Sequence, residues 1–151
     1  MFSAGYTDNN FPHLKIVHIL FQIQHGFLSD AQNMGMYEGE MLDGQPHGVG
    51  TIIYLTNDKF GRANYTGEWR FGMITGEGLM IWKSGAVYSG QILMNLMDGQ
   101  GNFSWPNGDY YAGQYINGKR NGVGDMLYGD GDVYRGAWRN GQYHGQGEYR
   151  W

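Results

Sequence analysis

Two histidines and two pairs of carboxylates are the side chains of this sequence that are most readily associated with chemistry. They are His47, His144, Glu38, Glu40, Asp130 and Asp132. Such side chains bind metal ions, and paired carboxylates also act as general acid and general base. Both histidines stand directly before a Gly-x-Gly sequence, a pattern that cradles phosphates in other contexts. Metal binding, acid–base catalysis and nucleotide binding are therefore the chemistries that these residue types could support.

None of these patterns extends into a complete motif. The Gly-x-Gly pairs lack the third glycine of a dinucleotide fingerprint, and no Gly-Lys-Ser or Gly-Lys-Thr phosphate loop occurs. After Asp130 and Asp132, the further ligand, glycine and distal glutamate of a calcium loop do not follow in register. No serine–histidine or cysteine–histidine arrangement stands out. We expect a protein that is not an enzyme and that binds neither a metal ion nor another cofactor.

The composition narrows the class of protein further. The net charge of −4 gives no electrostatic reason to expect a nucleic acid partner, whose binding depends on neutralising phosphates. The most apolar stretch, LKIVHILFQIQ, is about half the length that a bilayer crossing needs. The 27 glycines are accompanied by 16% aromatic residues, which flexible linkers lack. The absence of cysteine fits a reducing compartment, so we predict a folded cytoplasmic protein.

Tyrosine and glycine recur at a fixed spacing through most of the chain. Tyr65, Tyr88, Tyr111 and Tyr134 follow one another at intervals of 23 residues, and Tyr37 comes 28 residues before Tyr65. When each tyrosine is position one, glycine occupies positions three, twelve and fourteen of all five units. A period of this length is typical of tandem structural units. We predict a repeat domain over 37–151, with units starting at these tyrosines, after an N-terminal extension over 1–36.

Each unit is predicted to form one β-hairpin. Positions one, three and five alternate with more polar residues, and a second alternating run follows the glycine at position fourteen. The stretch between them, with glycine at position eight, is predicted to be a loop, and SG, NGD or DGD gives a tight turn between units. The first unit has a longer turn within LTNDKFGRAN. The predicted fold class is all-β, an antiparallel meander of five tandem hairpins.

Positions one, five, sixteen and eighteen are predicted to share one face of the sheet and to form an aromatic ladder. Glycine at position three would let a ring from the next strand lie over bare backbone. A single-layer sheet cannot cover its own apolar face, so we expect part of this face to be exposed or occupied by a partner.

The repeat also assigns the candidate chemical residues to ordinary structural positions. His47 and His144 share position eleven, which holds threonine, aspartate and asparagine in the other units, so we interpret it as a turn or cap site. Glu40 occupies position four, where the later units carry Glu68, Gln91, Gln114 and Ala137. This variation argues against a catalytic pairing of Glu38 and Glu40.

The pattern Tyr-x-Gly-x-Trp-x-x-Gly-x-x-His-Gly-x-Gly is matched throughout by the last unit, at Tyr134, Gly136, Trp138, Gly141, His144, Gly145 and Gly147. The third unit departs most, with Ile92, Asn95 and Asp98 at three of these positions. Over 37–151 the sequence resembles the MORN (membrane occupation and recognition nexus) repeat family. The resemblance implies an elongated, single-layer antiparallel sheet that twists into a shallow groove. It also implies a binding or scaffold role in the cytoplasm, peripheral to a membrane or to the cytoskeleton.

The first functional hypothesis is a scaffold whose aromatic groove binds a protein partner. The partner would be an amphipathic helix or another MORN protein, including a second copy in a homodimer. The predicted groove residues are Tyr65, Trp69, Trp82, Tyr88, Trp105, Tyr111, Tyr115, Tyr128, Tyr134 and Trp138.

The alternative hypothesis is a peripheral membrane module that binds acidic phosphoinositides. Its predicted contacts are Arg70, Lys83, Lys119, Arg120, Arg135 and Arg139. A third hypothesis is the regulatory repeat region of a larger phosphatidylinositol phosphate kinase or SET-type methyltransferase.

The two ends of the array differ from the repeats. Within 1–36, the segment PHLKIVHILFQIQHGFL suits either a strand, which would cap the sheet edge at Tyr37, or a helix, which would lie in the groove. The chain stops at position eighteen of the fifth unit and leaves an edge strand, which suggests a fragment, an oligomer or a further domain.

Overall fold

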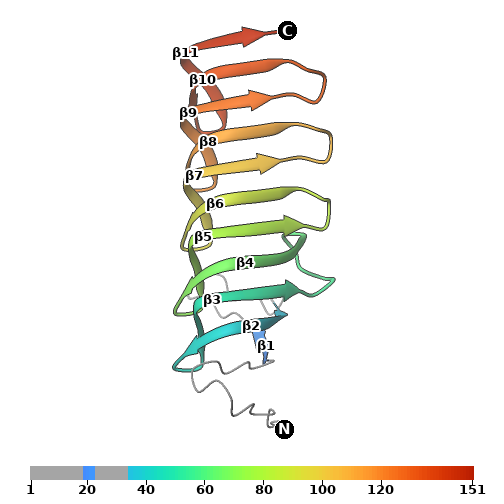
Figure 1. Ribbon diagram of the computed structural model, residues 1–151, viewed down its shortest axis with the longest axis vertical. Coiled ribbons are helices and arrows are strands. Elements are labelled where there is room, and N and C mark those ends of the chain that lie inside the picture. The colour runs from blue at the N-terminus through green and yellow to red at the C-terminus, as the bar shows by residue number, and fades with distance from the viewer. Residues whose placement is uncertain (1–18, 23–33) are drawn as a thin grey trace.

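The structure is a computed structural model that describes residues 19–22 and 34–151. These residues form one sheet of eleven strands whose spatial order follows the sequence from β1 to β11, each antiparallel to the next (Figure 1). The strands are β1 Ile19–Gln22, β2 Met34–Leu42, β3 Gln45–Tyr54, β4 Arg62–Arg70, β5 Met73–Trp82, β6 Val87–Leu93, β7 Leu96–Ser104, β8 Tyr110–Ile116, β9 Lys119–Leu127, β10 Val133–Arg139 and β11 Gln142–Arg150. The predicted all-β meander of five hairpins, from β2–β3 to β10–β11, is confirmed.

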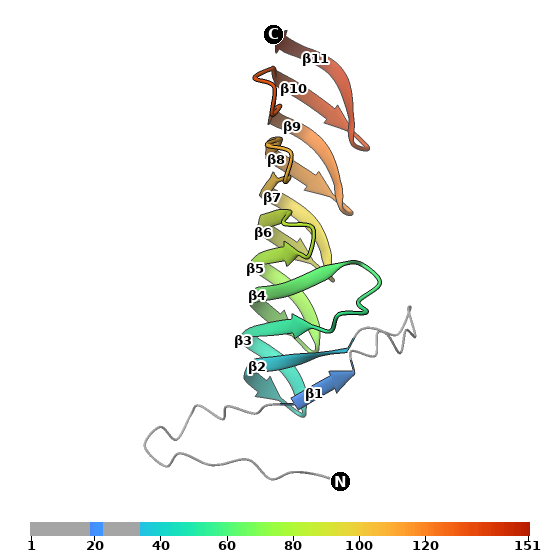
Figure 2. The ribbon, with the colours of Figure 1, turned by 90° about the vertical axis from the view of Figure 1, so that its right-hand side faces the viewer.

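The sheet is elongated, and its strands run across its long axis (Figure 1). Hairpin turns lie along one long edge and the connections between hairpins lie along the other (Figure 1). In the perpendicular view the strands bend, so that the sheet is curved across its width (Figure 2). Ile19–Gln22 forms β1, which pairs with β2 and places Ile19 opposite Tyr37. Of the two alternatives for this segment, these four residues adopt the strand. The predictions for 1–18 and 23–33 lie outside the described residues.

The predicted loop in the middle of each unit is wrong, because the structure has only a two-residue turn there. Both central residues have positive φ in every unit, as in type I′ turns, whose twist matches that of the flanking strands. The pairs are Asp43–Gly44, Phe71–Gly72, Met94–Asn95, Asn117–Gly118 and Asn140–Gly141. The second strand therefore starts at position nine, well before the alternating run that the sequence suggests.

A β-bulge interrupts each hairpin next to the turn. In the first hairpin, Gly39 pairs with Gly50 and Met41 with Pro46, so that Glu40 alone faces the residues between them. The side-chain oxygen at position four accepts a hydrogen bond from the backbone N–H at position thirteen. These bonds join Glu40 to Val49 (3.0 Å), Glu68 to Glu77 (3.0 Å), Gln91 to Gln100 (2.8 Å) and Gln114 to Val123 (2.9 Å). Position four is thus a clamp on the bulge, and both Glu and Gln occur there because both offer a side-chain oxygen that accepts this hydrogen bond.

The clamp can be tested in both directions. Gln114→Ala removes the acceptor of the Val123 N–H and should lower the free energy of unfolding by about 1 kcal/mol. Ala137→Gln places the missing acceptor in the fifth unit and should raise it by a similar amount, about 1 kcal/mol. Urea unfolding measures both effects, and Gln114→Glu, which keeps the oxygen, is the matched control. Equal stability of all four proteins would contradict the clamp.

The tyrosine at position one is the centre of each unit's core. Its exposed fraction is between 0% and 6% in all five units. Each hydroxyl donates a hydrogen bond to the carbonyl oxygen at position four of its own strand. The distances are 2.8 Å for Tyr37, 3.2 Å for Tyr65, 2.7 Å for Tyr88, 3.1 Å for Tyr111 and 2.9 Å for Tyr134. The same geometry in every unit fixes the ring against the sheet.

The glycines at positions three and fourteen lie beneath this ring. The expectation that a ring from the next strand covers position three is wrong, because the hydroxyl above Gly39 belongs to Tyr37, two residues earlier on the same strand. The ring carbons lie instead over the glycine at position fourteen, on the neighbouring strand. A Cβ on Gly50 would lie 2.6 Å from Cε2 of the Tyr37 ring, so only glycine fits there.

Position five completes the core from the next unit along the array. The Trp69 ring makes edge contacts with Tyr37 and Tyr65, at centroid distances of 5.2 and 5.5 Å. Trp138 contacts Tyr111 and Tyr134 in the same way, at 5.3 and 5.2 Å. The indole of Trp69 donates a hydrogen bond to the Gly50 carbonyl (3.1 Å), which ties consecutive hairpins together. The shared face of positions one, five, sixteen and eighteen is confirmed, and its rings make a core within a single layer.

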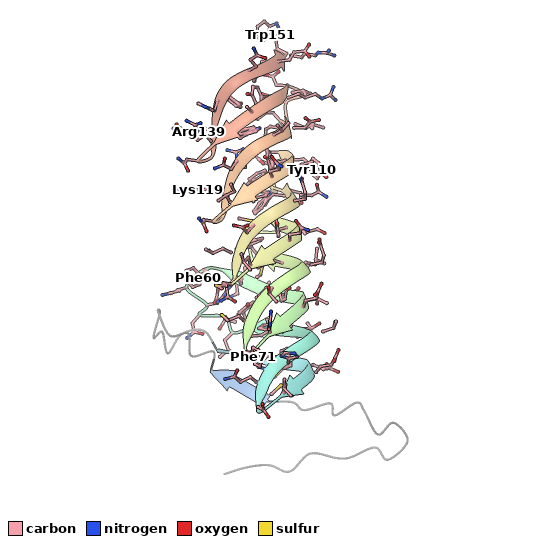
Figure 3. All side chains as sticks on the ribbon, turned by 90° about the vertical axis from the view of Figure 1, so that its left-hand side faces the viewer. Phe60, Phe71, Tyr110, Lys119, Arg139 and Trp151 are labelled. Carbon is pink, nitrogen blue, oxygen red and sulfur yellow. The ribbon has the colours of Figure 1, made fainter. Side chains whose placement is uncertain are left out.

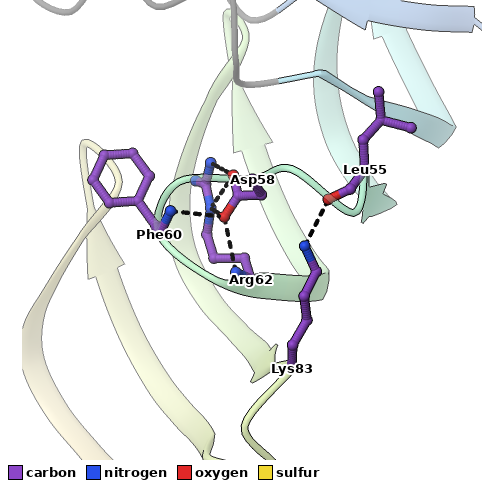
Figure 4. Close-up of polar contacts among 5 residues, drawn as sticks. All are labelled: Leu55, Asp58, Phe60, Arg62 and Lys83. Atoms are coloured by element: carbon purple, nitrogen blue, oxygen red, sulfur yellow. Dashed lines mark hydrogen bonds and ion pairs between the residues drawn. The ribbon is translucent and has the colours of Figure 1, made fainter.

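The longer turn predicted in the first unit is confirmed, and it is an ordered structure around a buried ion pair. Asp58, only 6% exposed, accepts hydrogen bonds from the backbone N–H groups of Phe60 (3.1 Å) and Arg62 (2.8 Å). Its carboxylate also forms an ion pair with the Arg62 guanidinium (2.7 Å), which packs 3.9 Å from the centroid of the Tyr54 ring. Lys83 donates a hydrogen bond to the Leu55 carbonyl (2.7 Å), so the turn also holds the second unit (Figure 4).

Candidate binding groove

The ten predicted groove residues all lie on the inner face, the face that carries the core cluster, but they differ in exposure. Seven are buried: Tyr65, Trp69, Tyr88, Tyr111, Tyr115, Tyr134 and Trp138. The other three, Trp82, Trp105 and Tyr128, are half-buried and pack against that cluster. All three occupy position eighteen of their units. Among these ten residues, the exposed ring surface therefore lies at position eighteen, and positions one and five lie in the core beneath it.

A continuous aromatic patch links the middle units. The Phe103 ring packs between Trp82, at a centroid distance of 5.2 Å, and Trp105, at 4.3 Å. Phe103 is itself half-buried and contacts Tyr88 in the core below at 6.4 Å. The patch thus offers apolar ring surface that stands on a hydrogen-bonded core, which suits an apolar partner surface.

Position ten adds side chains to this face that the sequence analysis missed. It holds Pro46, Ile74, Met97, Arg120 and Tyr143 in the five units. Met97 packs half-buried against the core cluster, and the Tyr143 ring stacks on Tyr134 at 4.1 Å. The predicted loop covered these positions, and residues of a loop cannot be assigned to one face of a sheet from their spacing. The recurring glycine or asparagine at position eight is the signal of a two-residue turn that would have revealed it.

Arg120 lies on this inner face beside the aromatic rings, although the sequence analysis grouped it with the lipid contacts. Its guanidinium is 4.3 Å from the centroid of the Trp138 ring and 5.9 Å from that of Trp105. One of its N–H groups donates to the Gly141 carbonyl at 3.0 Å. Cations are attracted to aromatic faces, so Arg120 contributes a positive charge to an otherwise aromatic surface.

Tyr37 and Tyr111, two of the core tyrosines, stay protonated over the physiological pH range. Burial, and next the nearby Glu40 carboxylate, raise the pKa of Tyr37 to about 12. Burial likewise raises the pKa of Tyr111 to about 12 against the opposing charge of Arg120. Each hydroxyl therefore remains a hydrogen-bond donor to the backbone. Among the described residues, the buried hydroxyl of Tyr115 has no hydrogen-bond partner. Tyr115 occupies position five, where Trp69 and Trp138 each donate an indole N–H to the preceding hairpin.

The six predicted lipid-contact residues do not converge on one site. Arg120 faces the rings, Lys83 bonds to the Leu55 carbonyl, and Arg135 forms an ion pair with Asp125 (3.2 Å). The remaining three, Arg70, Lys119 and Arg139, are exposed beside the hairpin turns. Lys119 and Arg139 project to one side of the sheet, opposite Tyr110 (Figure 3).

Two side chains at position eleven, Asp98 and His47, accept hydrogen bonds from the backbone of the next unit. Asp98, at position eleven, accepts a hydrogen bond from the Asn117 N–H in the next unit's turn (3.0 Å), as the cap interpretation predicts. His47 accepts a longer one from the Phe71 N–H (3.5 Å). Within residues 19–22 and 34–151, no three metal-ligating side chains come together. A polar hollow of about 430 Å³ lies between the bulges of the third and fourth units, but the side-chain oxygens of Gln91 and Gln114 that border it already clamp those bulges.

In the part of the chain that the structure describes, no helix has the length and apolar character to cross a membrane. A comparison with protein families finds the MORN repeat five times, at residues 37–59, 65–87, 88–110, 111–133 and 134–151. A search of curated proteins finds no match. The five matches start at the five core tyrosines and together span most of the sheet. The chain therefore belongs to the MORN repeat family.

Proposed function

We propose that this protein is a non-enzymatic scaffold whose inner groove binds an amphipathic helix of a protein partner. MORN repeats are modules of protein interaction and membrane association, and the groove gives this chain a surface of that kind. The observation that carries the proposal is the half-buried ring patch of Trp82, Phe103 and Trp105, which no second layer of the described residues covers.

The spacing of the rings supports a helical partner. Trp82, Trp105 and Tyr128 occupy the same position in consecutive units, two strands apart. Strands lie about 4.8 Å apart, so these rings repeat about every 10 Å along the sheet. Seven residues of an α-helix rise about 10.5 Å. A helix lying along the groove would therefore place side chains i, i+7 and i+14 against successive rings.

The double variant Trp82→Ala/Trp105→Ala tests the groove. Immobilised wild-type protein should retain a partner from an extract of its own cells, and should bind a synthetic amphipathic peptide with leucine at i, i+7 and i+14. The variant should lose at least about tenfold in peptide affinity, because buried aromatic anchors dominate such interfaces. Ile53→Ala/Val123→Ala, on the outer face, is the control and should bind normally. Undiminished capture by a folded Trp82→Ala/Trp105→Ala protein would refute the groove.

A further inference from the structure

Asparagine followed directly by glycine occurs four times in the chain, and all four pairs lie among the described residues. The pairs are Asn107–Gly108, Asn117–Gly118, Asn121–Gly122 and Asn140–Gly141. Asparagine is a chemically labile residue, above all before glycine. The backbone nitrogen of the glycine can attack the side-chain carbonyl carbon, Cγ, and close a five-membered succinimide ring. By sequence alone the four pairs are equivalent candidates for this reaction.

The structure separates the pairs by the hydrogen bond that each glycine N–H makes. In three pairs the N–H donates to the backbone carbonyl of another residue. These bonds run from Gly108 to Trp105 (3.0 Å), from Gly118 to Met97 (2.8 Å) and from Gly141 to Arg120 (2.9 Å). Before such a nitrogen can attack, it must lose its proton and leave its acceptor, so the backbone hydrogen bond opposes the reaction. The turns that contain these three pairs are therefore protected.

Gly122 is different, because its N–H donates to the side-chain oxygen, Oδ1, of Asn121 itself at 3.0 Å. The nitrogen that must attack is thus held beside the carbonyl group that it attacks. Reacting groups that are held within about 3.5 Å of each other react far faster than groups that move freely. Both residues are half-buried, so hydroxide and water still reach them. This pair combines proximity with access.

Asn121 also departs from the role of position eleven in the preceding unit. There, Asp98 accepts a hydrogen bond from the Asn117 N–H in the next unit's turn at 3.0 Å. The corresponding donor for Asn121 is the N–H of Asn140, but no hydrogen bond among the described residues joins the two. The Asn121 oxygen turns to Gly122 instead. Its side chain is therefore not held by the neighbouring hairpin.

We propose that Asn121 is a site of spontaneous deamidation and that it reacts before the other three asparagines. The Gly122 nitrogen loses its proton to hydroxide and forms a bond to Cγ of Asn121. The side-chain nitrogen takes up a proton from water and leaves as ammonia. A second water molecule then opens the succinimide at either of its two carbonyl groups. The products are an aspartyl residue and an isoaspartyl residue, whose backbone runs through the former side chain.

Both products change the junction between the fourth and fifth units. The aspartyl product adds a negative charge at position eleven and gives it the residue type that caps the next turn from Asp98. The isoaspartyl product lengthens the backbone of β9 by one carbon atom next to Gly122, which pairs with Trp138 of β10. This inference goes beyond the groove function, because it is a reaction of the chain itself and needs no partner.

The test is incubation of the purified protein in heavy-oxygen water at mildly alkaline pH, followed by peptide mapping with mass spectrometry. Each deamidation then incorporates one heavy oxygen atom, which excludes events that preceded the incubation. The folded protein should convert Asn121 at least about tenfold faster than any of the other three asparagines. In urea, where the hydrogen bonds that distinguish the pairs are lost, the four rates should approach one another.

Two variants serve as matched controls. Asn121→Gln lengthens the side chain, which makes ring closure much slower, and should abolish conversion at this position. Asn140→Gln should leave the rate at Asn121 unchanged. No conversion of Asn121 in the folded protein, or conversion of another pair as fast as Asn121, would overturn the proposal. Equal selectivity in urea would overturn it as well, because the flanking sequence and not the hydrogen bond would then select the site.

Discussion

Gly101→Ala is expected to lower the free energy of unfolding by about 3 kcal/mol, near the upper end of what overpacking a core costs. A Cβ at this position would lie 2.5 Å from Cε2 and 2.6 Å from Cζ of the Tyr88 ring. The ring cannot move aside, because it is fully buried, bonds through its hydroxyl to the Gln91 carbonyl at 2.7 Å, and meets the Tyr115 ring at 5.5 Å. The strand β7 must shift instead, and its pairing with β6 weakens.

Gly101→Ala should also change how cooperatively the array of hairpins unfolds. Among the described residues, each hairpin makes its extensive contacts with the hairpins next to it, so the cooperativity of the whole sheet depends on every junction. Weakening the third of five units separates the first two from the last two. Urea unfolding followed by circular dichroism should therefore show a lower midpoint and a broader, or two-step, transition compared with the wild type.

Gly118→Asn is the matched control for this experiment. Gly118 has a φ of 77°, a conformation that asparagine tolerates, and an added Cβ would meet nothing within 4 Å. The change should cost a few tenths of a kcal/mol, as expected of an accommodated surface substitution. If Gly101→Ala and Gly118→Asn unfold at the same urea concentration, the ring-over-glycine core is refuted.

The repeat spacing predicts the hairpins and their shared face, but it does not predict how each tyrosine ring reaches its glycines. Tyrosine at position one and glycine at positions three and fourteen keep their spacing in every unit, because each contributes to the same ring contact. The period alone therefore predicts five hairpins and the shared face. Which strand supplies the ring that covers each glycine depends on how the residues of the two strands pair across the bulge. The spacing of residues along one strand does not determine that pairing.

The repeat spacing does not predict the structural roles of the positions whose residue types vary between units. Position four holds Glu in two units and Gln in two, a composition typical of solvated surface, yet its side-chain oxygen accepts a hydrogen bond across the bulge in all four. The type I′ turns at Phe71 and Met94 could not be predicted from the sequence, because the sequence signal for such turns is asparagine or aspartate followed by glycine. The groove was predicted as one aromatic set, whereas Trp69 at position five is buried and Trp82, at position eighteen and the last residue of β5, is half-buried.

Asp58→Asn is expected to lower the free energy of unfolding by about 2 kcal/mol at pH 7, because it breaks a mostly buried ion pair with the Arg62 guanidinium and replaces charged hydrogen bonds by neutral ones. The substitution keeps the shape of the side chain but removes its charge. In the turn over residues 55–61, the asparagine oxygen can still accept the hydrogen bonds from the backbone N–H groups of Phe60 and Arg62, but these bonds are no longer made to a charged group. The exposed Asp43→Asn is the matched control and should stay within about 0.5 kcal/mol of the wild type.

The same ion pair should make the wild-type protein sensitive to acid. Burial of the Asp58 carboxylate opposes its ionisation, but hydrogen bonds from Arg62 and the charge of Arg62 outweigh burial and lower the pKa below its ordinary value of 3.8. Because the folded-state pKa lies below the unfolded one, the stabilisation is complete above about pH 5 and is lost as the pH falls through 4 and below. Urea unfolding at pH 7, 4 and 3 should therefore show the wild type approaching the stability of Asp58→Asn as the pH falls. A stability difference that stays constant across these pH values would show that the Asp58 charge contributes nothing, and that the two amide N–H contacts alone hold the turn.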